Sequence, residues 1–155
     1  LDAHPANLPA IVAGHSLGAP IAARLAMDEP SHIRALVLVS GSINPEQEKA
    51  AWYVRASRWK LLHWAVPKAL VMADDEIKPL RAELTDMLPR WASLHMPVTV
   101  IQGDADALVP PANADFAQRV LTNATVTMVR VPKQGHLIHW ERPDIIRDAI
   151  LSHLP

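Results

Sequence analysis

The chain has 155 residues, of which 50% are apolar and 20% are charged, so it carries enough apolar side chain for a core and intrinsic disorder is excluded. Its 15 Lys and Arg residues against 16 Asp and Glu residues give a net charge of −1, which excludes a global attraction to nucleic acid or anionic lipid. The absence of Cys excludes disulfides, thiolate metal centres and a cysteine nucleophile. No apolar stretch is long enough for a transmembrane helix.

Four short runs rich in Val and Ile predict strands that are buried on both faces. They are Ala10–Ala13, Ala35–Val39, Val98–Ile101 and Val126–Val131. A glycine follows each run, either directly or within a few residues; the four are Gly14, Gly41, Gly103 and Gly135. Open α/β sheets bind their ligands at the carboxyl ends of the strands. We therefore expect the functional residues near these glycines.

Helical patterns separate the predicted strands. Leu17–Met27 is rich in Ala and Leu and ends before Pro30, while Asn113–Leu121 and Pro143–Leu154 are typical of surface helices. The order strand, helix, strand, insert, strand, helix, strand, helix predicts an α/β fold with crossover helices.

The insert, residues 44–96, differs from the rest in composition and predicts two helices. Asn44–Gln47 has the residues of a helix start, and Asp74–Glu76 begins a second helix that runs through Leu88. Its aromatic residues are Trp52, Tyr53, Trp59, Trp64 and Trp91. Tryptophans at helical spacing usually pack against a core, and the alternative is that one of them lines an apolar pocket.

Residues 14–18 form a G-x-S-x-G motif between a predicted strand and a predicted helix. This motif predicts a sharp turn that presents the Ser16 hydroxyl above the sheet. We expect glycine at both Gly14 and Gly18 because a side chain there would collide with neighbouring backbone. The Leu17 N–H, at the start of the helix, would be free to bind a developing oxyanion.

A serine nucleophile needs a base that is itself oriented by a third group. Asp104 and Asp106 follow the third strand and His136 follows the fourth, which gives the chain order Ser, Asp, His. Either aspartate could be the acid, and His139 is a second histidine whose spacing from His136 also suggests a metal pair. No carboxylate or cysteine cluster accompanies that pair, so we expect no metal. We expect His15 to pack beside the turn.

Three segments resemble the nucleophile, acid and histidine motifs of the α/β-hydrolase superfamily: GHSLGA at 14–19, QGDADALVP at 102–110 and GHLIHWERP at 135–143. The resemblance covers nearly the whole chain. It implies Ser16 as nucleophile, Asp106 as acid, His136 as base and Leu17 as the donor of half of the oxyanion hole. It also implies a mostly parallel sheet with flanking helices, formed by residues 1–43 and 97–155, and a helical cap at 44–96.

Members of this superfamily have further strands before the nucleophile turn, and a loop there supplies the second oxyanion donor. We therefore expect the chain to be the C-terminal part of a longer hydrolase that requires those missing N-terminal strands. Without those strands, Ala10–Ala13 would form an exposed edge strand.

The resemblance implies a serine hydrolase that cleaves a carboxylic ester of a small-to-medium, largely apolar substrate through an acyl-enzyme. We expect no cofactor, no nucleic-acid partner and a cytoplasmic location. Thioesterase, lysophospholipase, C–C hydrolase, perhydrolase and acyltransferase reactions use the same residues and stay open. The rival interpretation is a non-catalytic binding protein of the same fold, or an inactive fragment.

Overall fold

The computed structural model describes residues 8–47 and 80–155. The chain divides into two compact units, one formed by Leu1–Ile43 with Met87–Pro155 and the other by Asn44–Asp86. The second unit begins at the residue where the sequence predicts the insert to begin, whereas residues 87–96 belong to the first unit. The predicted helix start at Asn44–Gln47 is a turn in which Oδ1 of Asn44 accepts the Glu46 N–H at 3.0 Å. The rest of that predicted helix, the acidic run at 74–76 and four of the insert aromatics lie outside the described residues. Those four are Trp52, Tyr53, Trp59 and Trp64.

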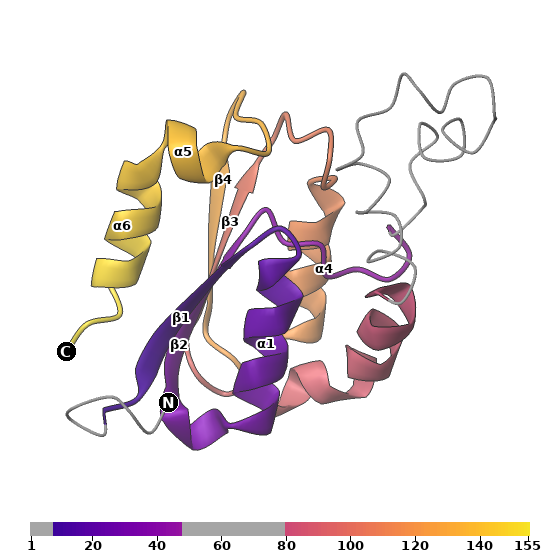
Figure 1. Ribbon diagram of the computed structural model, residues 1–155, viewed down its shortest axis with the longest axis vertical. Coiled ribbons are helices and arrows are strands. Elements are labelled where there is room, and N and C mark those ends of the chain that lie inside the picture. The colour runs from indigo at the N-terminus through magenta and orange to yellow at the C-terminus, as the bar shows by residue number, and fades with distance from the viewer. Residues whose placement is uncertain (1–7, 48–79) are drawn as a thin grey trace, which may run out of the picture. The chain divides into compact units, whose positions relative to one another are not determined.

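In the part of the chain that the structure describes, four strands form one parallel sheet in the order β1-β2-β3-β4 (Figure 1). They are β1 (Ala10–His15), β2 (Ile33–Val39), β3 (Val98–Gly103) and β4 (Val126–Val131). Each strand contains one of the four runs rich in Val and Ile, so the predicted parallel α/β sheet is confirmed. β2 and β3 are buried along almost their whole length because each has a strand on both sides.

Helices cover both faces of this sheet. They are α1 (Gly18–Asp28), α4 (Ala112–Val120), α5 (Ile138–Glu141) and α6 (Pro143–Leu151). In Figure 1, α1 and α4 lie on one face, whereas α5 and α6 lie on the other. The crossovers through α1 and α4 advance across the sheet in the same direction, so a common handedness places both helices on the same face. None of the helices described is long and apolar enough to cross a membrane.

The pleat of β2 divides its apolar side chains between the two faces of the sheet. Val37 and Val39 belong to a core cluster that includes residues of α6, and the alternate residues Leu36 and Leu38 take the other face. The cluster also contains Ile101, Val131, Ile138 and Ala149, with Ile11, Val129, Ile145, Ile146 and Ile150 packed against it. A strand that slipped by one residue would turn its core side chains to the opposite face of the sheet. This packing therefore fixes which residue lies at the carboxyl end of each strand.

A 3₁₀-helix replaces the end of the second predicted insert helix. Residues 80–87 are α-helical and continue into η2 (Leu88–Ser93), so the prediction of an α-helix through Leu88 is wrong by one residue. Pro89 gives the physical reason: it has no N–H for an α-helical hydrogen bond, and its ring disfavours the α conformation of the residue before it. A shorter 3₁₀-helix, η1 (Pro30–His32), follows α1 and leads into β2.

Candidate active site

The G-x-S-x-G segment forms the turn between β1 and α1. Ser16 has a φ of 54°, a left-handed conformation that costs a non-glycine residue about 1–3 kcal/mol. The Ser16 N–H donates to the Val39 carbonyl oxygen at 2.9 Å, which ties the turn to β2. The Ser16 carbonyl oxygen accepts from the N–H groups of Ala19 and Ser42 at 3.1 and 3.2 Å. These contacts hold the strained residue at the carboxyl edge of the sheet.

The two glycines of the motif differ in what surrounds them. A Cβ atom at Gly14 would lie 2.2 Å from the carbonyl oxygen of Gly18, so the first turn of α1 is too close to β1 for any side chain. A Cβ atom at Gly18 would have no such neighbour within 4 Å. The predicted collision is therefore confirmed at Gly14 and wrong at Gly18. The physical reason is that Gly18 contributes only its carbonyl group to the close contact with Gly14. The position that a side chain of residue 18 would occupy is open.

Leu17 lies at the N-cap of α1, directly after Ser16. No backbone hydrogen bond within residues 8–47 and 80–155 uses its N–H group. The first N–H groups of a helix lack intrahelical partners, and the helix dipole makes this end attractive to negative charge. The Leu17 N–H is therefore available to an oxyanion that forms beside the serine.

Asp106 lies in the loop after β3, and its side chain is 0% exposed. Its Oδ1 accepts the N–H groups of Leu108 and Val109 at 3.0 and 2.9 Å, which folds the loop around the carboxylate. Asp104, the alternative acid, is exposed, and its Oδ1 lies 4.0 Å from Nη1 of Arg130. Of these two aspartates, Asp106 is the one that is turned into the protein.

His136 lies in the loop after β4, and its Nδ1 lies 2.9 Å from Oδ2 of Asp106. Backbone contacts hold the two loops together. The Ala105 N–H donates to the Gln134 carbonyl oxygen at 3.0 Å, and a Cβ atom at Gly103 would lie 2.3 Å from that same oxygen. Glycine at the end of β3 therefore lets the histidine loop approach the aspartate.

Ser16 is linked to this pair through its neighbour His15. Nε2 of His15 donates to the backbone carbonyl oxygen of His136 at 2.9 Å, and the two ring centroids lie 4.7 Å apart. This contact ties the turn after β1 to the loop after β4, although these strands are the two edges of the described sheet. Among the described hydrogen bonds, none joins the Ser16 hydroxyl to His136. The structure thus brings Asp106 and His136 into contact and places the serine turn beside them.

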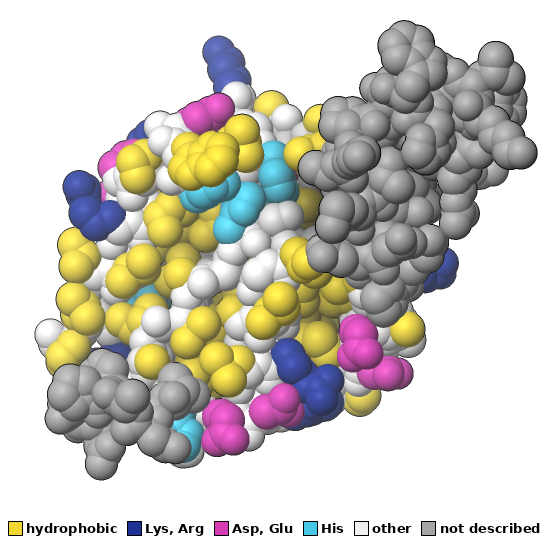
Figure 2. Space-filling model, viewed as in Figure 1, with side chains coloured by type: hydrophobic (Ala, Val, Ile, Leu, Met, Phe, Trp, Pro, Cys, Tyr) yellow, Lys and Arg dark blue, Asp and Glu magenta, His cyan; other side chains and the backbone are white. Residues whose placement is uncertain are grey.

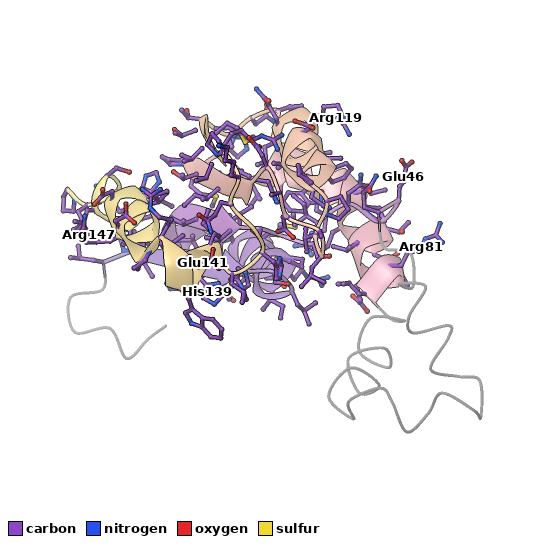
Figure 3. All side chains as sticks on the ribbon, turned by 90° about the horizontal axis from the view of Figure 1, so that it is seen from above. Glu46, Arg81, Arg119, His139, Glu141 and Arg147 are labelled. Carbon is purple, nitrogen blue, oxygen red and sulfur yellow. The ribbon has the colours of Figure 1, made fainter. Side chains whose placement is uncertain are left out.

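His139 and Trp140 extend the histidine cluster along α5. The His139 ring centroid lies 4.0 Å from that of His15 and 4.8 Å from that of Trp140. Figure 2 shows histidine side chains gathered beside apolar side chains, and Figure 3 labels His139 and Glu141 on α5. Nδ1 of His139 is buried and has no hydrogen-bond partner within the described residues. In the same part of the chain, no group of three or more His, Asp or Glu residues is arranged to hold a metal ion.

Burial lowers the pKa of His15 below the ordinary 6.5, and the hydrogen bond to the His136 carbonyl only partly opposes this. The unfolded chain therefore binds a proton at His15 at a higher pH than the folded chain does. We expect the contribution of His15 to the free energy of unfolding to be complete above about pH 6.5 and to be lost as the pH falls below that value.

Urea unfolding of the parent and of His15→Gln between about pH 5 and pH 8 measures this contribution, because glutamine does not titrate. The matched control is His32→Gln, which replaces an exposed histidine that pairs with Glu29. A pH dependence of stability that is the same in His15→Gln as in the parent would contradict the expectation.

Gln102, the first residue of the acid motif at 102–110, is a residue of this site to which the sequence analysis assigns no role. Its side-chain nitrogen lies 3.3 Å from Oδ2 of Asp106, and the residue is 1% exposed. The sequence signal is a glutamine at the end of a run that otherwise predicts a buried strand. Because a buried amide needs hydrogen-bond partners, a glutamine in that position indicates a polar neighbour at the strand end.

Known proteins resemble this chain in sequence. Residues 1–85 match the family described as "Serine aminopeptidase, S33". A protein of Klebsiella pneumoniae named "Putative carbamate hydrolase RutD" is 25% identical over 177 residues, which cover 92% of this chain and 66% of that protein. The chain therefore spans less than two thirds of the length of this relative.

Solved structures share the fold. The monoacylglycerol lipase of Paleococcus ferrophilus has a TM-score of 0.67 and 18% identity, covering 95% of this chain and 70% of that structure. The peroxisomal α/β-hydrolase Lpx1 of Saccharomyces cerevisiae has a TM-score of 0.66 and 17% identity, covering 99% of this chain and 53% of that structure. At these identities the likeness establishes the α/β-hydrolase fold.

Proposed function

Because this chain belongs to the serine aminopeptidase S33 family and has the α/β-hydrolase fold, we propose that it is a serine hydrolase that cleaves carboxylic esters of small-to-medium, largely apolar substrates. The observation that carries the proposal is the 2.9 Å contact between Nδ1 of His136 and Oδ2 of Asp106, at the same sheet edge as the strained Ser16 turn. An imidazole oriented by a buried carboxylate is the base that a serine nucleophile requires.

In the proposed reaction, Nε2 of His136 accepts the hydroxyl proton while Oγ of Ser16 attacks the carbonyl carbon of the ester. Asp106 accepts the hydrogen bond from Nδ1, which fixes the tautomer and stabilises the imidazolium. The Leu17 N–H donates to the oxyanion of the tetrahedral intermediate. The ester C–O bond then breaks, and the imidazolium gives its proton to the leaving alcohol. Water, deprotonated by the same imidazole, releases the carboxylic acid from the acyl-enzyme.

Exposed apolar side chains near the proposed acid and base support an apolar substrate. Leu108 lies two residues after Asp106, Leu137 directly follows His136, and Trp140 lies on α5; all three are exposed. Large apolar side chains beside a few polar groups are typical of sites that bind apolar ligands. The name of the Klebsiella relative suggests carbamates as a second acyl class, since the same nucleophile would attack a carbamate carbonyl.

We propose in addition that a further polypeptide segment pairs with β1. Among the described strands, β1 has a hydrogen-bonded neighbour on one side only, and it is less buried than β2. An open strand edge binds other strands readily. The relatives are longer than this chain. We propose that strands like those in the additional part of the relatives pair with β1 and supply the second oxyanion donor.

A fluorophosphonate probe tests the proposed nucleophile. We expect the phosphorus of the probe to form a bond to Oγ of Ser16 with loss of fluoride, so that mass spectrometry finds the modification on the peptide that contains Ser16. Ser16→Ala should take no label, and His136→Ala should be labelled more slowly by a factor of about 10² or more. Ser31→Ala and His95→Ala, which replace exposed residues of the same types, are the matched controls.

The same preparations are assayed with p-nitrophenyl butyrate and with a p-nitrophenyl carbamate. Faster turnover of the butyrate supports the proposed ester class, whereas turnover of the carbamate alone would replace it. A folded protein that takes no label, with or without the proposed additional strands, would overturn the assignment of a serine hydrolase and favour the non-catalytic rival.

A further inference from the structure

Within residues 8–47 and 80–155, the Asp106 carboxylate has four hydrogen-bond donors. Two backbone N–H groups of its own loop occupy Oδ1. Oδ2 is shared by two side chains: Nδ1 of His136 at 2.9 Å and Nε2 of Gln102 at 3.3 Å. Since the side chain is 0% exposed, these donors replace the water that would otherwise solvate the charge.

The Gln102 amide connects the end of β3 to the whole acid loop. Besides Asp106, its nitrogen lies 3.3 Å from the carbonyl oxygens of Gly103 and Val109, so its two N–H bonds are shared among three acceptors. Gly103 and Val109 are themselves buried. The amide therefore closes the loop from 103 to 109 and aims a donor at the oxygen that also faces the imidazole.

A neutral donor at this position has a specific electrostatic consequence. The amide places part of a positive charge against Oδ2 and so withdraws some of the negative charge that attracts the proton on Nδ1 of His136. A lysine or arginine would pair with Asp106 outright and compete with the imidazole. An apolar side chain would leave Oδ2 with a single donor.

We propose that Gln102 is a positioning residue of the hydrolytic site: its amide holds Oδ2 of Asp106 against His136 and moderates how strongly that oxygen stabilises the imidazolium. This inference rests on the proposed function. It assigns to Gln102 no contact with substrate, because the residue is 1% exposed and its described partners are Gly103, Val109 and Asp106.

The decisive variant is Gln102→Met, which has nearly the same shape and lacks the N–H groups. We expect kcat to fall by about tenfold, with KM unchanged, because Oδ2 of Asp106 loses the amide that holds it against the imidazole of His136. The acid limb of the kcat/KM profile should move to higher pH by about half a unit, since the uncompensated carboxylate holds the proton on His136 more strongly. A role in loop structure alone would lower kcat and leave the acid limb in place.

Gln102→Glu is the rescue variant. A carboxyl group buried beside a carboxylate is held in its protonated form, so near neutral pH the introduced group can donate its O–H to Oδ2. We expect Gln102→Glu to recover most of the kcat that Gln102→Met loses and to lose it again as the pH rises. Gln134→Leu is the matched control, because it removes a glutamine side chain of the histidine loop that pairs with Glu141 rather than with Asp106.

The parent protein is tested first with the fluorophosphonate probe and the butyrate ester, so that a failure of the proposed function is seen there. With an active parent, a Gln102→Met protein with the parent's kcat and acid limb would overturn the inference. So would a lowered kcat with an unmoved acid limb. If Gln102→Met does not fold, the test depends on Gln102→Glu. The inference is overturned if Gln102→Glu folds and its activity falls with rising pH no more than the activity of Gln134→Leu does.

Discussion

Replacing Asp106 by asparagine is expected to lower kcat by about 10⁴-fold while the protein stays folded. The asparagine Oδ1 can still accept the N–H groups of Leu108 and Val109, so the loop keeps its hydrogen bonds. The side-chain NH₂ group then takes the place of Oδ2 and points a donor at Nδ1 of His136. The imidazole avoids this conflict by carrying its proton on Nε2, the atom that accepts the proton of Ser16 in the proposed reaction.

Steady-state kcat with the butyrate ester, together with circular dichroism to verify folding, measures this effect. Asp104→Asn is a matched control, because Asp104 is exposed and faces Arg130 instead of the imidazole. We expect that variant to keep the parent's kcat. Equal losses in the two variants, or a loss of less than tenfold in Asp106→Asn, would contradict the assignment of Asp106 as the orienting acid.

Replacing Gly14 by alanine is expected to destabilise the protein by about 3 kcal/mol. The new Cβ atom would lie 2.2 Å from the carbonyl oxygen and 2.5 Å from the carbonyl carbon of Gly18, and 2.8 Å from the backbone nitrogen of Ala19. These are backbone atoms of the first turn of α1, so relief requires the helix to move away from β1. That movement would also displace the strained Ser16, so probe labelling should fall together with stability.

The urea midpoint of Gly14→Ala against that of Gly18→Ala tests this directly. Gly18→Ala introduces the same methyl group into open space at the start of α1, where alanine is favoured over glycine by up to about 1 kcal/mol. We expect it to be neutral or stabilising. Similar midpoints for the two alanine variants would show that the close approach at Gly14 can relax, and would refute the argument from backbone contact.

The strands were predictable because burial on both faces leaves a continuous apolar run in the sequence. The boundaries were less predictable where a polar side chain interrupts the run. β2 begins at Ile33 rather than Ala35, since Arg34 is exposed within the strand and its Nε donates to the His153 carbonyl oxygen at 2.7 Å. The sequence shows that Arg34 interrupts the apolar run, but it does not show that the distant carbonyl of His153 accepts a hydrogen bond from this arginine.

The contact between Asp106 and His136 could be anticipated, because parallel strands place the loops at their carboxyl ends along one edge. The bond from His15 to the His136 carbonyl could not, since the two residues are 121 positions apart and no residue type identifies its acceptor. The open position at Gly18 was equally hidden, because it depends on the direction in which α1 leaves the turn. The pattern of apolar residues therefore predicts which loops lie at the carboxyl edge of the sheet. The contacts between residues of those loops depend on side-chain packing, which the pattern does not contain.

Within the described sheet, Ser16 follows an outer strand, whereas the loop of Asp106 begins at an inner one. Fraying of a single outer strand costs less free energy than melting the whole sheet. Without the proposed additional strands, we expect fraying of β1 to carry the Ser16 turn away from His136, the proposed base, while the hydrogen bond between Nδ1 of His136 and Oδ2 of Asp106 persists. We therefore expect probe labelling of Ser16 to be lost on heating, reversibly at first, before cooperative denaturation.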